Sequence, residues 1–301
     1  MGSIIESRLE LSMRTRIFWF FCLLLFCIPG IGVSQNMSSG SQASFIVLPS
    51  FWFPEMKKSR LLIQDSVGSG PVLGEKVDLA NTFGVDDGPE MFPGVRALLG
   101  YRGSFYLRLG YQELRFDGNS MATAPIEFAG YTIQANTPVD TSNRFDYFEV
   151  GVQYNLINTE DFKLGILAEP KIMNMRLRVS GIGQEGSSGP AVPFCEKEEE
   201  VFAIPLVGVS VQLRPFDFLG IRGELKGLRI PNAEHLGMEI EGDVTAVDYE
   251  VAASLYFGDS FALTGGYRGL KFDIELEQSS SRNVDVDLEF RGWFAGLDLM
   301  F

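Results

Sequence analysis

Apolar and polar side chains alternate with a period of two along residues 247–257 of this chain. The apolar set has odd numbers and comprises Val247, Tyr249, Val251, Ala253, Leu255 and Phe257. Successive side chains of a β-strand point to opposite faces, so this segment predicts a strand with one apolar and one polar face. The pattern recurs along the chain and predicts an all-β fold.

The same alternation marks about ten segments as strands. They are residues 44–56, 92–101, 104–116, 144–156, 162–178, 200–213, 218–230, 245–257, 260–276 and 284–301. Each is long enough to cross a bilayer, which takes about 9–11 residues of a tilted strand. After residue 34 no continuous apolar stretch has the length of a membrane helix.

The connections between these strands alternate in length. Long or medium connections (57–91, 117–143, 180–199 and 231–243) alternate with short ones (102–103, 157–161, 214–217 and 258–259), and the last connection, 277–283, is short to medium. Transmembrane barrels have short turns at one end and longer loops at the other. The chain therefore predicts a transmembrane antiparallel up-and-down β-barrel of about ten strands, with eight or twelve as alternatives. A soluble β-sandwich alternates in the same way and is the competing interpretation, but aromatic residues near the strand ends favour the barrel.

The last nine residues form the most specific segment. Its outer face is predicted to carry Trp293, Ala295, Leu297, Leu299 and Phe301. An alternating strand that ends in an aromatic residue resembles the closing strand of bacterial outer-membrane β-barrels. The chain as a whole resembles the small OmpA-like and porin-like barrel proteins of Gram-negative bacteria. The resemblance implies a place in the outer membrane, contact with its lipid, and recognition of the last strand by the barrel-assembly machinery.

The N-terminal residues predict a secretory signal peptide. Arg14 and Arg16 precede an apolar run at 17–28, which Pro29 and Gly30 interrupt. We expect a leader at 1–34 and a barrel domain at 35–301, and the start of translation, at Met1 or Met13, stays open. Of the three cysteines only Cys195 lies beyond the leader, so no internal disulfide is expected.

Net charge excludes one class of partner. The chain carries a formal charge of −14, which opposes binding to nucleic-acid phosphates. No cofactor and no metal are expected, and an extracellular partner is not identified by the sequence.

The polar faces of the strands are predicted to line the lumen. The main candidates are Arg222, Glu224, Asp248, Glu250, Arg268, Asp285, Asp287 and Glu289, with Arg108, Glu149, Glu169, Lys171, Lys226 and Arg291 as further members. A ten-strand lumen is narrow and unpaired buried charges are costly, so we expect a filled interior of ion pairs. A narrow diffusion pore with a charged constriction is the alternative. The spacing of Asp285, Asp287 and Glu289 also suits calcium, but no glycine-bearing metal loop accompanies them.

No catalytic residue is assigned. His235 is the only histidine, and the omptins, which are barrel proteases, have an aspartate two residues before theirs, where this chain has Ala233. A barrel-embedded hydrolase that uses His235 with Glu234 or Glu239 is therefore the second alternative. The leading hypothesis is a structural or surface-interaction role.

Two irregularities are expected in the strands. Pro49, Pro170 and Pro205 lie inside predicted strands, where they remove ladder donors, so bulges or different strand limits are expected there. The apolar parity also changes between Phe290 and Trp293, which predicts a bulge at Arg291–Gly292.

Overall fold

The computed structural model describes residues 43–65, 77–85, 88–101, 103–122, 125–128, 131–185, 189–230, 240–278 and 282–301. The predicted signal peptide and His235, with Glu234 and Glu239, lie outside these residues. No helix in the described part of the chain is long and apolar enough to span a membrane.

Strands make up most of the described residues. They are β1 (Ala43–Asp65), β2 (Val77–Asp78), β3 (Phe92–Tyr101), β4 (Phe105–Met121), β5 (Ile126–Phe128), β6 (Tyr131–Ile133), β7 (Pro138–Asn158), β8 (Phe162–Ala168), β9 (Lys171–Glu185), β10 (Ala191–Ile204), β11 (Val207–Phe216), β12 (Leu219–Ile230), β13 (Ile240–Phe257), β14 (Phe261–Gln278) and β15 (Arg282–Met300). A short helix, α2 (Leu79–Phe83), follows β2.

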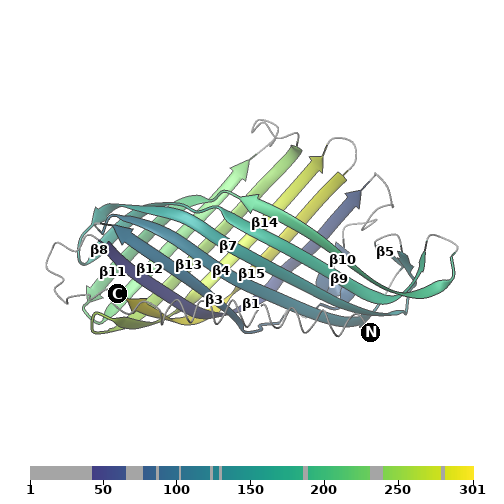
Figure 1. Ribbon diagram of the computed structural model, residues 1–301, viewed down its shortest axis with the longest axis horizontal. Coiled ribbons are helices and arrows are strands. Elements are labelled where there is room, and N and C mark those ends of the chain that lie inside the picture. The colour runs from purple at the N-terminus through teal and green to yellow at the C-terminus, as the bar shows by residue number, and fades with distance from the viewer. Residues whose placement is uncertain are drawn as a thin grey trace. The chain divides into compact units, whose positions relative to one another are not determined.

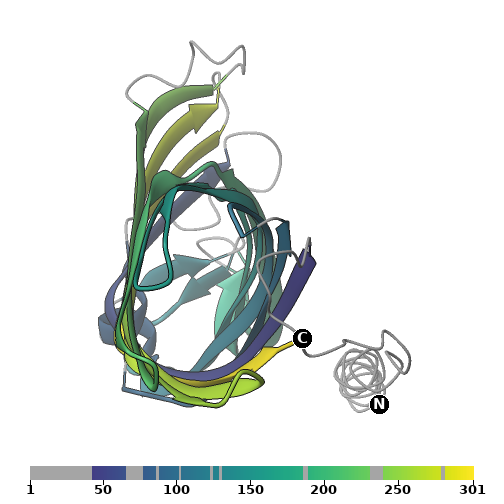
Figure 2. The ribbon, with the colours of Figure 1, turned by 90° about the vertical axis from the view of Figure 1, so that its left-hand side faces the viewer.

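The strands close into an antiparallel ring, which confirms the predicted barrel. Its order is β1, β3, β4, β7, β8, β11, β12, β13, β14 and β15, and the pairing of β15 with β1 closes it. Figure 1 shows the strong tilt of these strands, and Figure 2 shows the ring from one end. Phe301 and Phe45 exchange two backbone hydrogen bonds of 2.8 and 3.1 Å beside this closing pair.

Two prolines interrupt strands without shifting their register. Pro170 separates β8 from β9, and Pro205 separates β10 from β11. Val152 pairs with Ala168 and Glu149 with Lys171, so β7 keeps one register across the break. Of the two expectations for these prolines, a bulge is wrong and different strand limits are confirmed: β8 ends at Ala168 and β10 at Ile204, and the missing donors interrupt the ladder only locally. Pro49 lies in β1, which keeps one register with β15 on both sides of it.

The bulge predicted at Arg291–Gly292 is also wrong. The register of β14 with β15 is unbroken. The register shift lies instead in the neighbouring strand β1, between Met56 and Lys58, where β1 pairs with β15. Gly292 instead serves a close approach, because a Cβ there would lie 1.9 Å from the carbonyl oxygen of Phe53.

The apolar face of β15 changes from the inner to the outer side of the barrel along the strand. In its first half Val286, Leu288 and Phe290 are fully buried inside. In its second half the opposite parity is apolar and exposed, as at Trp293 and Leu297. Since side chains alternate without a bulge, the interior is apolar at one end of the barrel and the exterior is apolar at the other.

The end with the apolar interior is packed as two facing sheet walls. One wall contains β4, β7, β9 and β10, and the other contains β12, β13, β14, β15 and β1. Aromatic rings meet between them: Phe290 lies 5.7 Å from Phe116 and 5.0 Å from Phe145, between ring centroids.

The long connections predicted from sequence are shorter than expected. β1 continues to Asp65, β4 to Met121, and β9 and β10 pair as a long hairpin across residues assigned to a loop. Beside these extended strands, β2 pairs with β1, and Val85 forms an isolated β-bridge with Gly118 of β4.

Candidate functional site: a charged layer across the lumen

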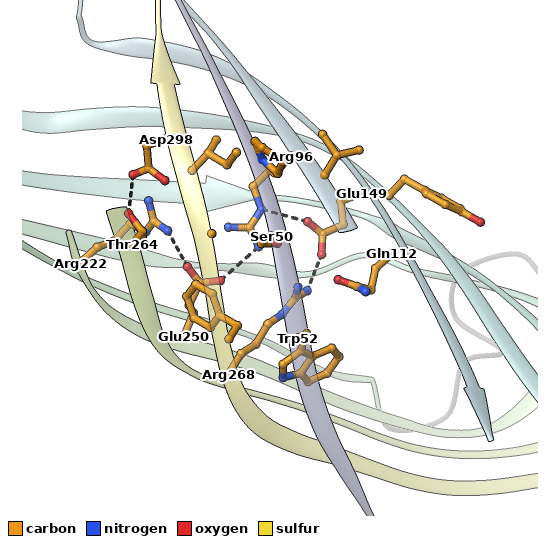
Figure 3. Close-up of a pocket in the computed structure, with 16 residues that line it drawn as sticks. Ser50, Trp52, Arg96, Gln112, Glu149, Arg222, Glu250, Thr264, Arg268 and Asp298 are labelled. Atoms are coloured by element: carbon orange, nitrogen blue, oxygen red, sulfur yellow. Dashed lines mark hydrogen bonds and ion pairs between the residues drawn. The ribbon is translucent and has the colours of Figure 1, made fainter. Parts of the chain in front are cut away.

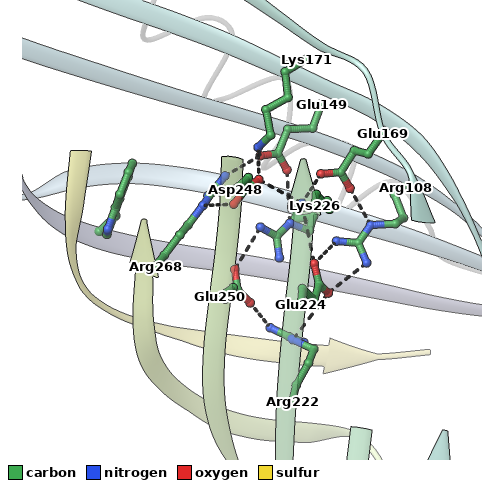
Figure 4. A network of polar contacts seen from close by, with 12 residues as sticks. Arg108, Glu149, Glu169, Lys171, Arg222, Glu224, Lys226, Asp248, Glu250 and Arg268 are labelled. Carbon is green, nitrogen blue, oxygen red and sulfur yellow. Dashed lines mark hydrogen bonds and ion pairs between the residues drawn. The ribbon is translucent and has the colours of Figure 1, made fainter. Parts of the chain in front are cut away.

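Inward side chains of seven strands form one charged layer inside the barrel. Each strand contributes residues of its inward parity, and Glu169 comes from the break between β8 and β9. The layer comprises six cations and five carboxylates: Arg96, Arg108, Lys171, Arg222, Lys226 and Arg268, with Glu149, Glu169, Glu224, Asp248 and Glu250. Figure 4 shows these side chains converging from opposite walls.

Arg108 links two carboxylates at one side of the charged layer. Its side chain is 2 % exposed. Its Nε donates to Glu169 at 2.7 Å, and its Nη2 donates to Glu224 at 2.7 Å. This use of both edges of the guanidinium links β4 to β12 across the lumen, a geometry that arginine provides and lysine does not.

Two buried lysines form ion pairs at the centre of the charged layer. Lys171 forms ion pairs with Glu149 and, at 2.6 Å, with Asp248. Lys226 forms ion pairs with Glu169 and, at 3.0 Å, with Asp248. Each ammonium group therefore bridges two carboxylates, which compensates the cost of taking these charges out of water.

Three carboxylates in this layer lie close enough to share a metal ion. Oxygens of Glu149, Glu169 and Asp248 lie within 4.8 Å of one another. The ammonium groups of Lys171 and Lys226 already bind these oxygens. The donor set therefore fits an internal ion-pair network better than a divalent cation, whose sites exclude ammonium groups from the ligand shell.

A small cavity lies against the charged layer, on the side of the short turns. Its volume is about 40 Å³, room for about three water molecules. Figure 3 shows Arg96, Arg222 and Arg268 around it, with Arg96 bonded to Glu149 at 3.3 Å and to Glu250 at 3.2 Å. Thr264 donates to Asp298 at 2.9 Å at its edge. The polar lining of both signs suits water, and the ion pairs close its inner side.

Comparison with solved structures identifies the fold. The outer membrane protease OmpT from Escherichia coli has a TM-score of 0.53 and 11% sequence identity, over 86% of this chain and 97% of that chain. The fold is that of a bacterial outer-membrane β-barrel. The chain is also similar to OprG from Pseudomonas aeruginosa, with 13% identity over 87% of this chain and 98% of that chain and a TM-score of 0.31. Ail of Yersinia pestis has 8% identity over 87% of this chain and 100% of that chain, with a TM-score of 0.32. No protein-family profile and no curated protein sequence matches the chain.

The structure brings five of the predicted lumen residues together. Arg222, Glu224, Asp248, Glu250 and Arg268 all lie in the charged layer, with the further candidates Arg108, Glu149, Glu169, Lys171 and Lys226. Apart from Glu169, which lies between β8 and β9, these residues share the inward parity of their strands.

The structure places Asp285, Asp287 and Glu289 elsewhere. They alternate with Val286, Leu288 and Phe290, which fill the interior, so their carboxylates lie on the outer face of β15. Asp287 bonds there to Lys58 of β1 at 3.1 Å. Their assignment to the lumen is therefore wrong, because the interior at this end is apolar. Arg291, 3.9 Å from Glu289, shares this outer face.

Sequence reasoning missed Arg96. This residue joins Glu149 to Glu250, two carboxylates on opposite walls. A signal was available, because Arg96 is the only charged residue in the segment 92–101 and has the inward parity. Buried charge in an otherwise apolar strand indicates a partner inside the fold.

Proposed function

We propose that the protein is an integral outer-membrane barrel with a closed lumen, which acts as a structural or surface-interaction protein rather than a pore. The observation that carries this proposal is the double obstruction of the interior. The charged layer joins opposite walls, and the aromatic core of Phe116, Phe145 and Phe290 fills the lumen beyond it. A solute would have to break both.

The outer surface supports a place in a membrane. Aromatic residues on the outer face lie in two groups along the wall. The group near the charged layer comprises the exposed Phe148 and Trp293 with the half-buried Tyr111, Tyr249 and Tyr267. The group near the short turns is exposed and comprises Tyr101, Phe105, Tyr154, Phe216, Phe218, Phe257, Phe261 and Phe301. On β13 the interval from Tyr249 to Phe257 covers nine residues. A tilted strand of this length crosses the hydrocarbon core of a bilayer, and aromatic girdles mark its two surfaces.

The closing strand is proposed to carry the assembly signal. Trp293 and Leu297 lie on the outward face of β15, and Phe301 follows its last residue. All three side chains are exposed, which leaves them accessible to a partner on the membrane side. The barrel-assembly machinery and outer-membrane lipid are the partners that this proposal names, and a signal peptide at 1–34 would direct export.

Planar-bilayer conductance tests the closed lumen. The protein, refolded and confirmed by a heat-dependent gel shift, is expected to insert without discrete current steps. The variant Arg108→Ala/Phe290→Ala, which thins both obstructions, is the matched positive control and is expected to conduct more. Regular open steps from the unaltered protein would reject the closed lumen and favour the alternative, a narrow diffusion pore for small solutes.

A barrel-embedded hydrolase is the second alternative. The fold is shared with a protein described as a protease, but an identity of 11% carries the fold alone. The hypothesis depends on His235, so loss of any measured hydrolytic activity in His235→Ala would support it, and unchanged activity would remove it.

A further inference from the structure

Three arginines lie side by side on the outer face of the wall that contains β4, β7 and β9. In the registers of these neighbouring strands, Arg115 pairs with Arg144 and Arg144 pairs with Arg176. Arg144 has the same parity as the exposed Phe148 of β7. Figure 1 shows the three strands in one wall. Like charges directly opposite one another destabilise a sheet, so this row has a cost that a bound anion would reduce.

The arginine row lies just beyond the aromatic residues that mark one surface of the proposed lipid belt. Tyr111 precedes Arg115 by four residues on β4, and Phe148 follows Arg144 by four residues on β7. Four residues of a strand span about 13 Å, which a tilt of about 45° reduces to about 9 Å of height. The polar headgroup layer is about 5–8 Å thick on each side of a bilayer.

A shared carboxylate turns two of the guanidinium groups back toward this layer. Nε and Nη2 of Arg144 donate to Asp146 at 3.1 and 2.9 Å, and Nη2 of Arg176 donates to the same carboxylate. Asp146 is two residues closer than Arg144 to Phe148, so both cationic groups reach the level of the headgroups. The hydroxyl of Tyr111 donates to Asp146 at 3.0 Å and helps to fix this acceptor.

The two arginines retain donors for a ligand. A guanidinium group has five N–H donors, and the Nη1 groups take no part in the bonds to Asp146. The Nε atom of Arg176 is buried, lies 3.8 Å from Glu199 and has no hydrogen-bond partner within the described part of the chain. This buried donor indicates that the arginine row accommodates a further polar group.

The opposite wall has a different arrangement of charge. On the arginine wall, the next row outward adds Arg178 of β9, which pairs with Lys197 of β10. On the outer face of β1, β14 and β15, by contrast, Lys58 and Lys271 both pair with Glu289, which lies between them. Neighbouring cations on the first wall attract an anion more strongly than cations that alternate with acids on the second.

We propose that the outer face of β4, β7 and β9 binds the phosphomonoester group of an anionic lipid. Arginine binds phosphate through two parallel N–H donors, and adjacent strands space these groups about 5 Å apart. The exposed side chains of Phe148 and Ile172 lie on the membrane side of the row and contact the acyl chains. A lipid is favoured over a free anion because the cationic and apolar surfaces adjoin on the same strands.

The proposal rests on the function proposed above for the level of the bilayer, which co-flotation with phosphatidylcholine vesicles tests separately. A folded barrel that does not float with these vesicles would reject the proposed membrane location. A barrel that floats but does not prefer a phosphomonoester lipid would reject the lipid site alone. The preference itself is measured in micelles, so it is decided in either case.

Native mass spectrometry of the barrel in zwitterionic micelles measures binding and identifies each ligand by its mass. The probes are dioleoyl phosphatidic acid, dioleoyl phosphatidylcholine and inorganic phosphate. We expect phosphatidic acid to bind about tenfold more tightly than phosphatidylcholine at low salt, and inorganic phosphate not to be retained at the same concentration. Equal binding of the two lipids, or equal retention of inorganic phosphate, would overturn the proposal.

Two triple variants with the same change in net charge separate this face from general attraction, each after a heat-dependent gel shift confirms folding. The test variant is Arg115→Gln/Arg144→Gln/Arg176→Gln. The control, which removes three cations from the outer face of β1, β14 and β15, is Lys58→Gln/Lys271→Gln/Arg291→Gln. We expect the test variant to lose the preference for phosphatidic acid and the control to keep it. Equal loss in the two variants, or no loss in the test variant, would overturn the proposal.

A charge-conserving variant tests the geometry of the site. Arg144→Lys/Arg176→Lys keeps both charges but removes the planar groups that bind phosphate through two donors. It is expected to lose part of the preference for phosphatidic acid. Unchanged binding would show attraction by charge alone and would contradict the arginine site.

Discussion

Lys226 shows how a single residue stabilises the charged layer inside the barrel. Its side chain is 1% exposed and contacts Glu169, Asp248 and, at 3.7 Å, Glu224. A buried ammonium group is costly to desolvate, and so is each carboxylate around it. Their mutual attraction offsets these costs only while every member is present. Removal of one cation therefore leaves several buried negative charges without compensation.

Lys226→Met is accordingly expected to lower the free energy of unfolding by about 3–5 kcal/mol, the usual cost of breaking a buried ion pair. The control is Lys197→Met, which removes an exposed pair with Glu199 and is expected to cost less than about 1 kcal/mol. Urea unfolding of the refolded barrel, followed by tryptophan fluorescence, measures both. A similar small loss in the two variants would contradict the stabilising role of the network.

At the scale of the strand, one element serves two environments. The outer face of β14 carries Leu263 near the short turns and Glu275 near the other end. Leu263 pairs with Leu297, whereas Glu275 pairs with Asp285. The inner face shows the reverse order, from Thr264 to the buried Phe272. A strand that passes from lipid into water must exchange its apolar and polar faces, because the apolar face follows the lipid outside and the core inside.

Leu263→Arg and Glu275→Arg test this exchange on one face of one strand. In phospholipid vesicles, the first is expected to destabilise the barrel by about 2–4 kcal/mol, the cost of arginine near the bilayer midplane. The second is expected to change stability by less than about 1 kcal/mol, as for an exposed charge. Equal costs would place both residues in the same environment and contradict the proposed lipid belt.

Phe301 permits a separate test of the closing strand. Its ring lies 6.0 Å from that of Phe45, between centroids. If the residue acts mainly as an assembly signal, Phe301→Ala should strongly reduce the amount of barrel inserted in cells but leave refolding in micelles nearly unchanged. Gel-shift assays of membranes and of refolded protein give the two measurements. An equal loss in both would indicate a structural role alone.

The sequence was sufficient to predict the strands in the half of the barrel whose outer face is apolar, and insufficient for the other half. Regular alternation located the ring strands, and parity selected Arg222, Glu224, Asp248, Glu250 and Arg268 for the interior. Asp285 was misplaced because parity identifies a shared face but not which face is inside. The extension of β10 was missed because a run such as Glu196–Glu200 has the composition of a solvated loop. Its pairing with β9 depends on residues distant from that run.

At the scale of the molecule, the barrel combines two kinds of interior along one axis. The half with the apolar outer face has a polar interior that the charged layer crosses, and the other half has an aromatic core between two sheet walls. In the proposed membrane-bound state, the hydrophobic effect would stabilise the first half by contact with lipid outside, and it stabilises the second by burial inside. The two tryptophans of the barrel lie at the boundary between these halves.

These tryptophans offer a direct test of the whole arrangement. Trp52 is 1% exposed and its Nε1 donates to the carbonyl of Gly292, whereas Trp293 is 68% exposed on the neighbouring strand. The protein used lacks residues 1–34 and therefore Trp19. In vesicles of brominated lipid, Trp52→Phe should then leave a fluorescence that lipid quenches strongly, because only the outward Trp293 remains. Trp293→Phe should leave a fluorescence that lipid hardly quenches. The reverse result, or equal quenching, would show that the lipid does not surround the face that the barrel turns outward here.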